Sequence, residues 1–440
     1  MNVMQYPVNN IDDAYNACDP EEALPAGDER YQDLNPVRGG NNVAEIIARR
    51  IRRVSRGRDF HQQLLTGHRG CGKTTELSRL QERLGDQRFF SVYLDVEEHL
   101  DLGDLVYLDI LLAIAKVVEA KLREAKIGLD QKLISELEHW FAEIEESEEH
   151  HTSLDGAVKT EAEVGAGIPL LGKLLANLTS QISSGSSRRQ VIRRTLGHDL
   201  NVFLDRLNAL LFSARQGIKK AGFGDLIVIV DGLEKMHFRE LDDGQSNHRV
   251  IFVEHAEQLK APRCHIIYTI PISLVFNANL SDTFTDPAIV LPMVKFQTSD
   301  GKQALRDLVA RRIQLDLLFE DPDLVNELIA MSGGAVRDLM RLIRMACDRV
   351  DDVITAADVE AAIQQYVREF DRLLREEDLE SLRYVRQNRR TADAKFSRPL
   401  NLRLIHEYQN SERWADLHPA LQRLPWVEEA LRDGHEPTSQ

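Results

Sequence analysis

The residues with the clearest chemistry form one glycine-rich run, Gly67-His68-Arg69-Gly70-Cys71-Gly72-Lys73-Thr74-Thr75. Its spacing matches the phosphate-binding pattern GxxxxGK[ST], which needs a strand before it and a helix after it. Glycines let the backbone turn tightly and point N–H groups at phosphate oxygens, and the N-terminus of the following helix adds positive potential. The run therefore predicts a site for a nucleoside triphosphate.

Several residues of this run have predicted roles. Lys73 is expected to reach the β- and γ-phosphates, and the hydroxyl of Thr74 is expected to bind Mg²⁺. Cys71 is interpreted as a small loop residue, with a reactive thiol beside the phosphate-binding amides as the alternative. The loop residues predicted to bind the nucleotide are Gly67, Gly70, Cys71, Gly72, Lys73, Thr74 and Thr75.

A second acidic group follows the apolar run Leu226–Asp231, whose sequence LIVIVD is typical of a parallel strand covered on both faces. A carboxylate at the C-terminal end of such a strand faces the crevice where ligands bind, so Asp231 is expected to hold the hydration shell of Mg²⁺. Glu234, three positions later, is expected to polarise the attacking water. The alternative is a strand-end acid that caps the next helix.

Elements that position these groups are visible in the hydrophobic pattern. Buried strands alternate with helices, which predicts an α/β three-layer core with a parallel sheet. The expected strands are 60–66, 89–95, 226–231 and 265–270. A helical insertion of about 104–221 separates the second and third strands; it contains helices at 104–125, 130–146 and 188–221 and a Gly-, Ser- and Thr-rich connection at 147–187. From about residue 300 only helices are expected, at 302–318, 322–331, 335–350 and 356–375.

The amino-acid composition limits the class of protein that the chain can be. The 440 residues carry a net charge of −16, with 43% hydrophobic and 29% charged residues, which excludes low-complexity disorder and argues against general coating of nucleic acid. The four cysteines lie far apart and none has CxxC spacing, so neither a zinc site nor a disulfide framework is expected. The N-terminus does not have the pattern of a signal peptide, and no apolar stretch reaches the roughly 20 residues needed to span a bilayer. We expect a cytoplasmic protein that does not enter a membrane.

Four parts of the chain are predicted from these patterns. They are an irregular N-terminal arm at 1–30, a P-loop core at 31–298 that includes the insertion, a helical lid at 299–375 and a C-terminal domain at 376–440. In the arm, Asn, Asp, Glu and Pro predominate. A helix near 42–51 is expected to follow it, with Asn41 or Asn42 as the N-cap.

Together, the two motifs resemble those of AAA+-type P-loop ATPases, in the branch shared by STAND ATPases and origin-recognition-type ATPases. The run Val230-Asp231-Gly232-Leu233-Glu234 is similar to the STAND form of the Walker B motif, in which a small residue follows the Asp and a second acid comes three positions later. The resemblance covers about residues 31–365. It implies ATP and Mg²⁺ as cofactors.

Three further segments extend the resemblance. Val37-Arg38-Gly39-Gly40 is similar to the adenine-side box of that branch, which implies that Arg38 and Gly39 lie beside the nucleotide. Ser332 to Asp338 resembles the start of the lid helix, where Arg337 would be the sensor 2 arginine that reads the γ-phosphate. Thr269, near the end of its strand, falls where sensor 1 would lie. The implied catalytic residues are Lys73, Asp231, Glu234, Thr269 and Arg337.

The chain departs from that family pattern in three ways. Asp231 lies 158 positions after Lys73, which the helical insertion explains. The window between Arg263 and Lys295 holds no Arg or Lys, so the expected arginine finger is missing and hydrolysis should be slow unless a finger comes from elsewhere or from a partner. STAND proteins usually carry an effector domain and a repeat sensor, and neither fits in 440 residues. We therefore expect a separately encoded effector or sensor protein.

The C-terminal segment has a different charge from the rest. Residues 381–403 hold seven basic side chains against one acid, and the family resemblance implies a winged helix here. One interpretation is an electrostatic surface for the phosphate backbone of DNA, centred on 383–403. The other is a solvated face, or a surface that docks an acidic partner or the chain's own acidic arm. The same segment is expected to contain helices around Leu379–Val385 and Leu400–Ile405.

The resemblance implies a function in outline. The leading hypothesis is an ATP-binding, slowly ATP-hydrolysing switch that forms a nucleotide-dependent oligomer and controls its partner in bacterial defence or signalling. The alternative is a DNA-acting ATPase of the origin-loading or transposition-regulator type. A third hypothesis is a nucleotide-binding scaffold that does not hydrolyse ATP.

Overall fold

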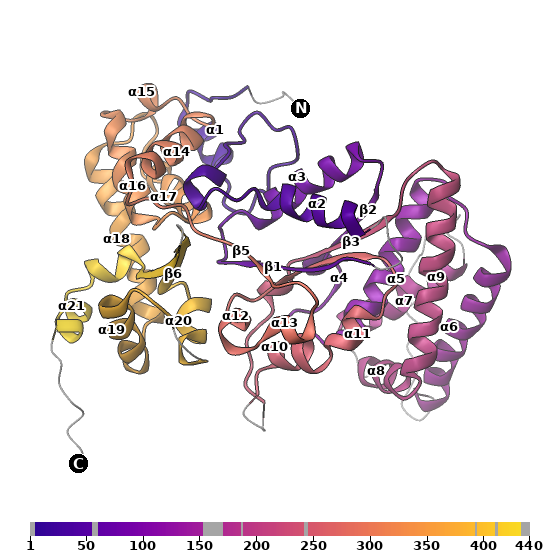
Figure 1. The fold of residues 1–440 in the computed structure, drawn as a ribbon. Coiled ribbons are helices and arrows are strands. Elements are labelled where there is room, and N and C mark those ends of the chain that lie inside the picture. The colour runs from indigo at the N-terminus through magenta and orange to yellow at the C-terminus, as the bar shows by residue number, and fades with distance from the viewer. Residues whose placement is uncertain are drawn as a thin grey trace, which may run out of the picture.

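The computed structural model describes residues 5–54, 60–152, 170–185, 188–241, 245–391, 394–409 and 412–432. Its centre is a five-stranded parallel sheet in the order β2-β3-β4-β1-β5 (Figure 1). The strands are β1 (Gln62–Gly67), β2 (Phe90–Asp95), β3 (Leu226–Asp231), β4 (His265–Ile270) and β5 (Ile289–Leu291). The expected α/β core with a parallel sheet is confirmed. Strand β5 was not expected, because three residues at a sheet edge give no periodic signal.

Helices cover both faces of this sheet, as continuous apolar strands require. Alternate side chains of a strand point to opposite faces. Ile227 and Ile229 of β3 pack toward α2 (Val43–Val54) and α3 (Lys73–Asp86). Val228 and Val230 of the same strand join a second core with the helices of the insertion. The sheet is thereby fixed between two apolar layers, and its C-terminal edge is held in one position.

The insertion between β2 and β3 is a helical bundle beside the sheet (Figure 1). Its helices are α4 (Val96–His99), α5 (Tyr107–Glu124), α6 (Gln131–Thr152), α7 (Leu170–Ser183), α8 (Arg188–His198) and α9 (Leu200–Lys220). The prediction of one helix across 188–221 was wrong, since the chain breaks at Asp199. Within the predicted connection 147–187, α7 is a buried helix, and residues 153–169 lie outside the described part.

Arginines at the start of α8 anchor this bundle instead of facing a partner. Arg189 contacts Asp101 and Asp104 at 2.8 Å each, and its side chain is almost buried. Arg193 contacts Asp104 at 2.8 Å and Asp109 at 2.5 Å. Arg189 and Arg193 are therefore paired with acids of the same molecule and are not free to bind an acidic partner.

The N-terminal arm is more ordered than its composition suggested. Helix α1 (Ile11–Ala17) begins where the side chain of Asn10 accepts a hydrogen bond from the N–H of Asp13, a standard N-cap contact. After it, a short 3-10 turn, η1 (Asn35–Arg38), leads to α2. Asn42 caps α2 through the N–H of Glu45, as expected. The description of the arm as irregular was therefore wrong for residues 11–17.

Between β3 and β5 lie short elements under the sheet: η2 (Leu233–Lys235), α10 (Asn247–Arg249), the π-helical turn η3 (Val250–Glu254), α11 (Ala256–Lys260), α12 (Leu274–Asn277) and α13 (Leu280–Thr283). The lid follows, with α14 (Ser299–Ala310), α15 (Leu315–Leu318), η4 (Pro322–Leu324), α16 (Val325–Met331), α17 (Val336–Cys347) and α18 (Ala356–Leu373). The lid is all-helical, as expected. The predicted helix 302–318 is two helices, because the chain turns at Arg311 and Arg312.

The C-terminal module combines helices with one antiparallel hairpin. Its elements are η5 (Glu376–Asp378), α19 (Leu379–Asn388), η6 (Ala394–Phe396), α20 (Ser397–Asn401), β6 (Ile405–Gln409), β7 (Arg413–Leu417), η7 (Pro419–Arg423) and α21 (Pro425–Arg432). The expected helix at 379–385 is present. The helix expected across 400–405 ends at Asn401, and Ile405 begins β6. Leu404 and Ile405 are buried in the apolar core that the C-terminal module shares with the lid.

Across the described ranges, no helix is long and apolar enough to span a membrane.

Candidate nucleotide-binding site

The glycine-rich loop joins β1 to α3 at the C-terminal edge of the sheet. Gly70 and Gly72 have φ values of 82° and 94°, a left-handed conformation that side chains disfavour. A Cβ at Gly70 would lie 2.5 Å from the Cβ of Arg337, and one at Gly67 would lie 2.6 Å from the carbonyl oxygen of Leu291. Glycine is required here because the lid and β5 approach the loop backbone closely.

Lys73 begins α3, and its ammonium group is buried. Nζ donates to the carbonyl oxygens of Gly67 and His68, each at 3.1 Å, and lies 3.0 Å from Oε1 of Glu234. Burial alone would lower the pKa of Lys73, but the charge of Glu234 and the hydrogen bond to it outweigh burial and raise that pKa. The lysine is therefore held as a cation inside the loop, where it is available to phosphate.

The predicted Mg²⁺ ligands lie next to each other. Oγ1 of Thr74 donates to Oδ2 of Asp231 at 2.7 Å, and the hydroxyl of Tyr93 donates to the same oxygen at 2.6 Å. The other carboxylate oxygen of Asp231 accepts the N–H of Gly232 at 2.8 Å. Sequence reasoning missed Tyr93. The signal was available, since Tyr93 alternates with the buried Val92 and Leu94 on the strand beside β3.

Glu234 occupies the short turn η2 directly after β3 and is almost completely buried. Burial raises the pKa of its carboxyl group, but Lys73 outweighs that effect and holds the pKa below its usual value, with a smaller contribution from Thr269. Oε2 of Glu234 has no hydrogen-bond partner. The structure thus brings Lys73, Glu234 and Thr269 together at the C-terminal edge of the sheet.

The segment resembling an adenine-side box packs against the loop. Nη2 of Arg38 donates to the carbonyl oxygen of Cys71 at 2.6 Å, and Arg38 lies 4.0 Å from Glu76 of α3. Gly39 ends η1 with a φ of 98°. Cys71 itself is fully buried, which fits its interpretation as a small loop residue. Arg38 therefore contacts the loop and also lines the cavity described below, whereas Gly39 is not among the lining residues.

The lid reaches the loop through the first turn of α17. The N–H of Arg337 donates to the carbonyl oxygen of Gly70 at 3.2 Å. Its guanidinium group turns toward the N-terminal arm, where Nε donates to the carbonyl oxygen of Pro20 at 3.2 Å and Nη2 lies 3.0 Å from Oε2 of Glu21. The predicted sensor 2 residue is thus at the site, but its charge is neutralised by the arm.

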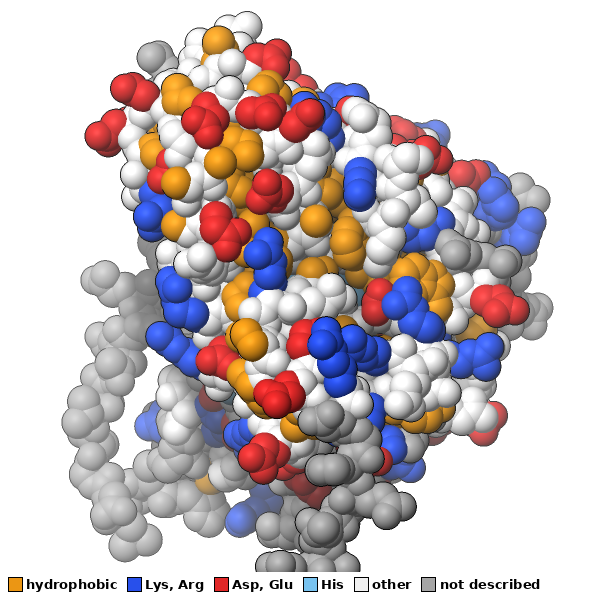
Figure 2. Space-filling view, turned by 90° about the vertical axis from the view of Figure 1, so that its left-hand side faces the viewer, with side chains coloured by type: hydrophobic (Ala, Val, Ile, Leu, Met, Phe, Trp, Pro, Cys, Tyr) orange, Lys and Arg blue, Asp and Glu red, His pale blue; other side chains and the backbone are white. Residues whose placement is uncertain are grey.

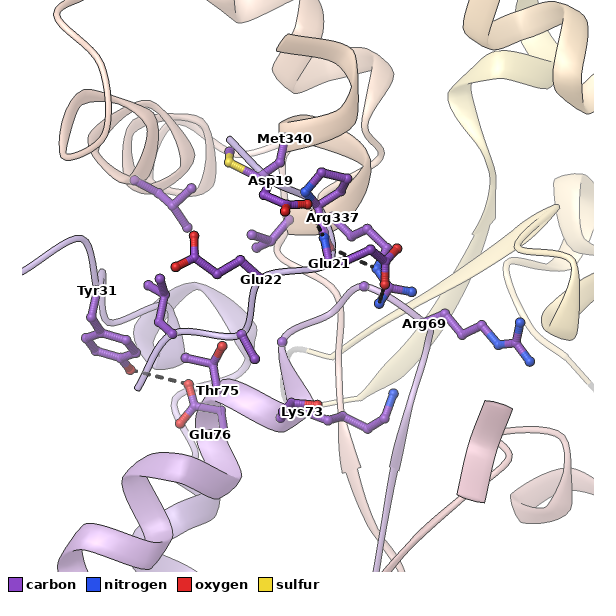
Figure 3. Close-up of a pocket in the computed structure, with 18 of the residues that line it drawn as sticks. Asp19, Glu21, Glu22, Tyr31, Arg69, Lys73, Thr75, Glu76, Arg337 and Met340 are labelled. Atoms are coloured by element: carbon purple, nitrogen blue, oxygen red, sulfur yellow. Dashed lines mark hydrogen bonds and ion pairs between the residues drawn. The ribbon is translucent and has the colours of Figure 1, made fainter. Parts of the chain in front are cut away.

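Residues of core, lid and arm line one cavity of about 330 Å³, shown in Figure 3; of the groups described above, Arg38, Lys73, Thr74, Glu234 and Arg337 belong to its wall. A cavity of this size falls in the range that holds small-molecule ligands. The loop contributes Gly70, Gly72, Lys73, Thr74 and Thr75 to its wall. Apolar side chains also line it, among them Leu24, Leu34, Leu308, Val336 and Met340. The wall of the cavity therefore combines the glycine-rich loop and its lysine with apolar side chains and with several carboxylates.

The cavity wall also includes residues that the motifs did not indicate. Arg69 lies at the loop, and burial lowers the pKa of its guanidinium group. Tyr31 of the arm donates its hydroxyl hydrogen to Glu76 at 3.3 Å and stacks with Arg79, whose guanidinium lies 4.1 Å from the ring centre. No sequence motif pointed to the arm, because these contacts join positions more than 40 residues apart.

The C-terminal hairpin contacts the loop from the other side. Nε2 of His68 accepts the N–H of Glu407 at 3.0 Å, and both residues are buried. The hydroxyl of Tyr408 donates to the carbonyl oxygen of Gly333 in the lid at 2.8 Å. Strand β6 thereby links the glycine-rich loop to the lid.

Next to this contact, Asp338, His406 and His418 form a buried cluster whose ligand atoms lie within 4.8 Å of one another. Nδ1 of His418 accepts the N–H of Ala420 at 3.0 Å, which places the proton on Nε2 and removes that atom as a metal ligand. Asp338 is also paired with Arg403. We interpret the cluster as a hydrogen-bonded core that joins lid and hairpin.

Acidification should weaken this core. Burial lowers the pKa of His406 to about 4 and those of His68 and His418 well below 6.5. In the unfolded chain these groups bind protons near pH 6.5, so stability is full above that pH and falls as the pH drops toward 4, by about 1.4 kcal/mol per pH unit for each histidine. The midpoint temperature of thermal unfolding should therefore be lower at pH 5.5 than at pH 7.5.

Two variants isolate that effect. His406→Gln should reduce the difference in midpoint between the two pH values, whereas His139→Gln, at a side chain that is 82% exposed, should leave the difference unchanged. A midpoint that rises on acidification would contradict the assignment of neutral buried histidines.

Among the described residues, five of the seven basic side chains at 381–403 form intramolecular ion pairs. Arg386 contacts Glu428 at 3.0 Å, Arg389 contacts Asp416 at 2.7 Å, and Lys395 contacts Glu380 at 2.9 Å. Arg398 pairs with Asp378, and Arg403 with Asp338. Figure 2 shows blue side chains lying among red ones on this side of the molecule. The local excess of positive charge is therefore largely compensated by acids from other segments.

Comparisons with known proteins give a distant likeness. No protein-family model and no curated protein matches the chain. Among solved structures, the Orc1 protein of Aeropyrum pernix in complex with DNA is similar with a TM-score of 0.42 at 14% identity, covering 95% of each chain. Cdc6p from Pyrobaculum aerophilum has a TM-score of 0.41 at 12% identity, covering 95% of this chain and 97% of that one. Drosophila ORC bound to DNA has a TM-score of 0.40 at 10% identity, covering 98% of this chain and 94% of that one. Because these values are low, the function of this chain has to be argued from its own site.

Proposed function

We propose that the chain is an ATP-binding, ATP-hydrolysing switch of the AAA+ type. The observation that supports this most directly is the convergence of Lys73, Thr74, Glu234 and Arg337 on one cavity at the C-terminal edge of a parallel sheet, with Asp231 bonded to Thr74 beside it. The loop amides and Lys73 would bind the phosphates, and the apolar side chains of the wall would take the base. Equilibrium binding of ATP to the purified chain tests the proposal.

A magnesium ion fits the residues present. The Thr74 hydroxyl and the Asp231 carboxylate, 2.7 Å apart, are hard oxygen donors of the kind that Mg²⁺ prefers. When bound, the ion would neutralise charge on the phosphates. Tyr93 holds the carboxylate of Asp231 in place through its hydroxyl group.

Glu234 is the residue proposed to activate water. It is anionic, because Lys73 holds its pKa low, and one of its oxygens has no partner in the protein. Phosphate arriving at Lys73 would share the ammonium group and loosen its contact with Glu234. The carboxylate would then be a better proton acceptor when ATP is present than when the site is empty.

Switching is proposed to involve the lid and the C-terminal module. The loop contacts the lid through the N–H of Arg337 and the hairpin through His68, so a change of loop conformation on nucleotide binding would reach both. We propose that the output is nucleotide-dependent assembly with a separately encoded partner. The STAND branch and a role in defence or signalling rest on the Walker B likeness alone.

DNA binding through a winged helix at 376–440 is the second candidate. The ion pairs along 386–403 favour the first candidate, a switch that assembles with a partner protein, because paired arginines offer less charge to the phosphates of DNA. We therefore expect a labelled DNA duplex to show no strongly salt-dependent binding in fluorescence anisotropy.

Affinity that falls on the order of 10³-fold between about 50 and 200 mM salt would instead indicate several phosphate contacts and support the DNA-acting alternative. Such binding should then weaken when Arg386 and Arg389 are replaced by Gln. An exposed pair elsewhere, Arg52 and Arg53 of α2, provides the matched control.

A further inference from the structure

The N-terminal arm forms part of the wall of the nucleotide cavity. Helix α1 packs on α17 of the lid, and Val8 pairs with the lid at Ile313, with the N–H of Val8 donating to Arg312 at 2.8 Å. From there the chain returns along the cavity, so that residues 19–24 form part of its wall (Figure 3). The arm is therefore a built part of the site.

This wall is acidic where a nucleotide would be most negative. Asp19, Glu21 and Glu22 line the cavity together with the phosphate-binding loop. Asp19 is paired with Arg344 at 3.1 Å, and Glu22 with Arg30 at 2.6 Å. Glu21 differs from both, because its partner is Arg337, a cavity residue at the start of α17.

Glu21 is well placed to be displaced. Its side chain is 70% exposed, whereas that of Arg337 is 26% exposed and is anchored by its backbone contact with Gly70. A γ-phosphate that approached Arg337 would meet the Glu21 carboxylate, and two anions beside one guanidinium group repel each other. Glu21, the more exposed and better solvated anion, is the one that leaves.

We infer that Glu21 is an internal counter-ion that the γ-phosphate of ATP displaces from Arg337, so that this residue lowers the affinity for ATP more than that for ADP. The inference rests on the proposed function, since it requires a nucleotide in the cavity. It adds a specificity residue on a segment that carries no nucleotide motif. Release of Glu21 would also loosen the arm from the lid.

The test compares Glu21→Gln with Glu29→Gln by titration calorimetry with ATP and with ADP. Glu29 lies on the same arm, is exposed and does not line the cavity, so the two variants change the net charge equally. Glu21→Gln should lower the Kd for ATP about two- to fivefold, the size of one partly exposed ion pair, and change the Kd for ADP much less. Glu29→Gln should change neither.

A second arm of the experiment uses Arg337→Ala. In that background, Glu21→Gln should no longer change the ratio of the two dissociation constants. Hydrogen exchange of the peptide covering 17–24 should increase when ATP, but not ADP, is added to the wild-type chain.

Three results are decisive. Equal effects of Glu21→Gln on ATP and ADP, or no difference from Glu29→Gln, would overturn the inference while leaving ATP binding intact. An effect of Glu21→Gln on the ratio of the two dissociation constants that persists in the Arg337→Ala background would overturn it as well. If the wild-type chain binds neither nucleotide, the proposed function is wrong and the inference falls with it.

Discussion

Lys73→Ala is expected to lower the affinity for ATP by a factor on the order of 10² to 10³. Loss of one partner from a buried charged contact costs about 2–5 kcal/mol, and Lys73 is the buried cation of the loop, held by Gly67, His68 and Glu234. Titration calorimetry with ATP and Mg²⁺ measures the change.

The control for this experiment is Lys219→Ala, which removes an equal charge from the exposed end of α9. A thermal melt of each variant shows whether the fold is kept, since Glu234 loses its partner in Lys73→Ala. Unchanged ATP affinity in a folded Lys73→Ala protein would mean that the loop is not the phosphate site.

Glu234→Gln is expected to lower the rate of ATP hydrolysis by about 10²- to 10⁴-fold, the usual contribution of a positioned general base. ATP affinity should stay the same or improve, because the neutral amide no longer competes with phosphate for the charge of Lys73. Release of phosphate from saturating ATP measures the rate, and calorimetry measures the affinity.

Glu97→Gln is the matched control, because Glu97 lines the same cavity but pairs with Lys235 instead of Lys73. It should leave turnover within about twofold of the wild-type value. Equal turnover of the wild-type and Glu234→Gln proteins would contradict the role of Glu234 and would favour another base or a chain that does not hydrolyse ATP.

Much of the core could be predicted from local sequence. Strands β3 and β4 occupy the residues expected for them, because continuous apolar runs bounded by polar residues have few alternatives. The meeting of Lys73 with Asp231 and Glu234 followed from two motifs and one general rule, that ligands bind at the C-terminal edge of a parallel sheet.

What local sequence did not show depends on contacts between distant segments. Nothing in the composition of the arm indicates that Glu21 meets Arg337, since their contact joins the two halves of the chain. The segment at Ile405 was expected to be helical, because the spacing of its apolar residues fits the period of a helix as well as that of a strand. Burial against the lid favours the strand that the structure shows. The positive charge at 383–403 looked available, but most of its basic side chains pair with acids from other segments.

The central claim is that the cavity bounded by the loop, the lid and the arm binds ATP. Titration of the wild-type chain with ATP in the presence of Mg²⁺ tests it most directly. We predict saturable binding of one ATP per chain, lost in Lys73→Ala and retained in Lys219→Ala. No saturable heat in the wild-type titration, with an intact fold by thermal melting, would contradict the claim.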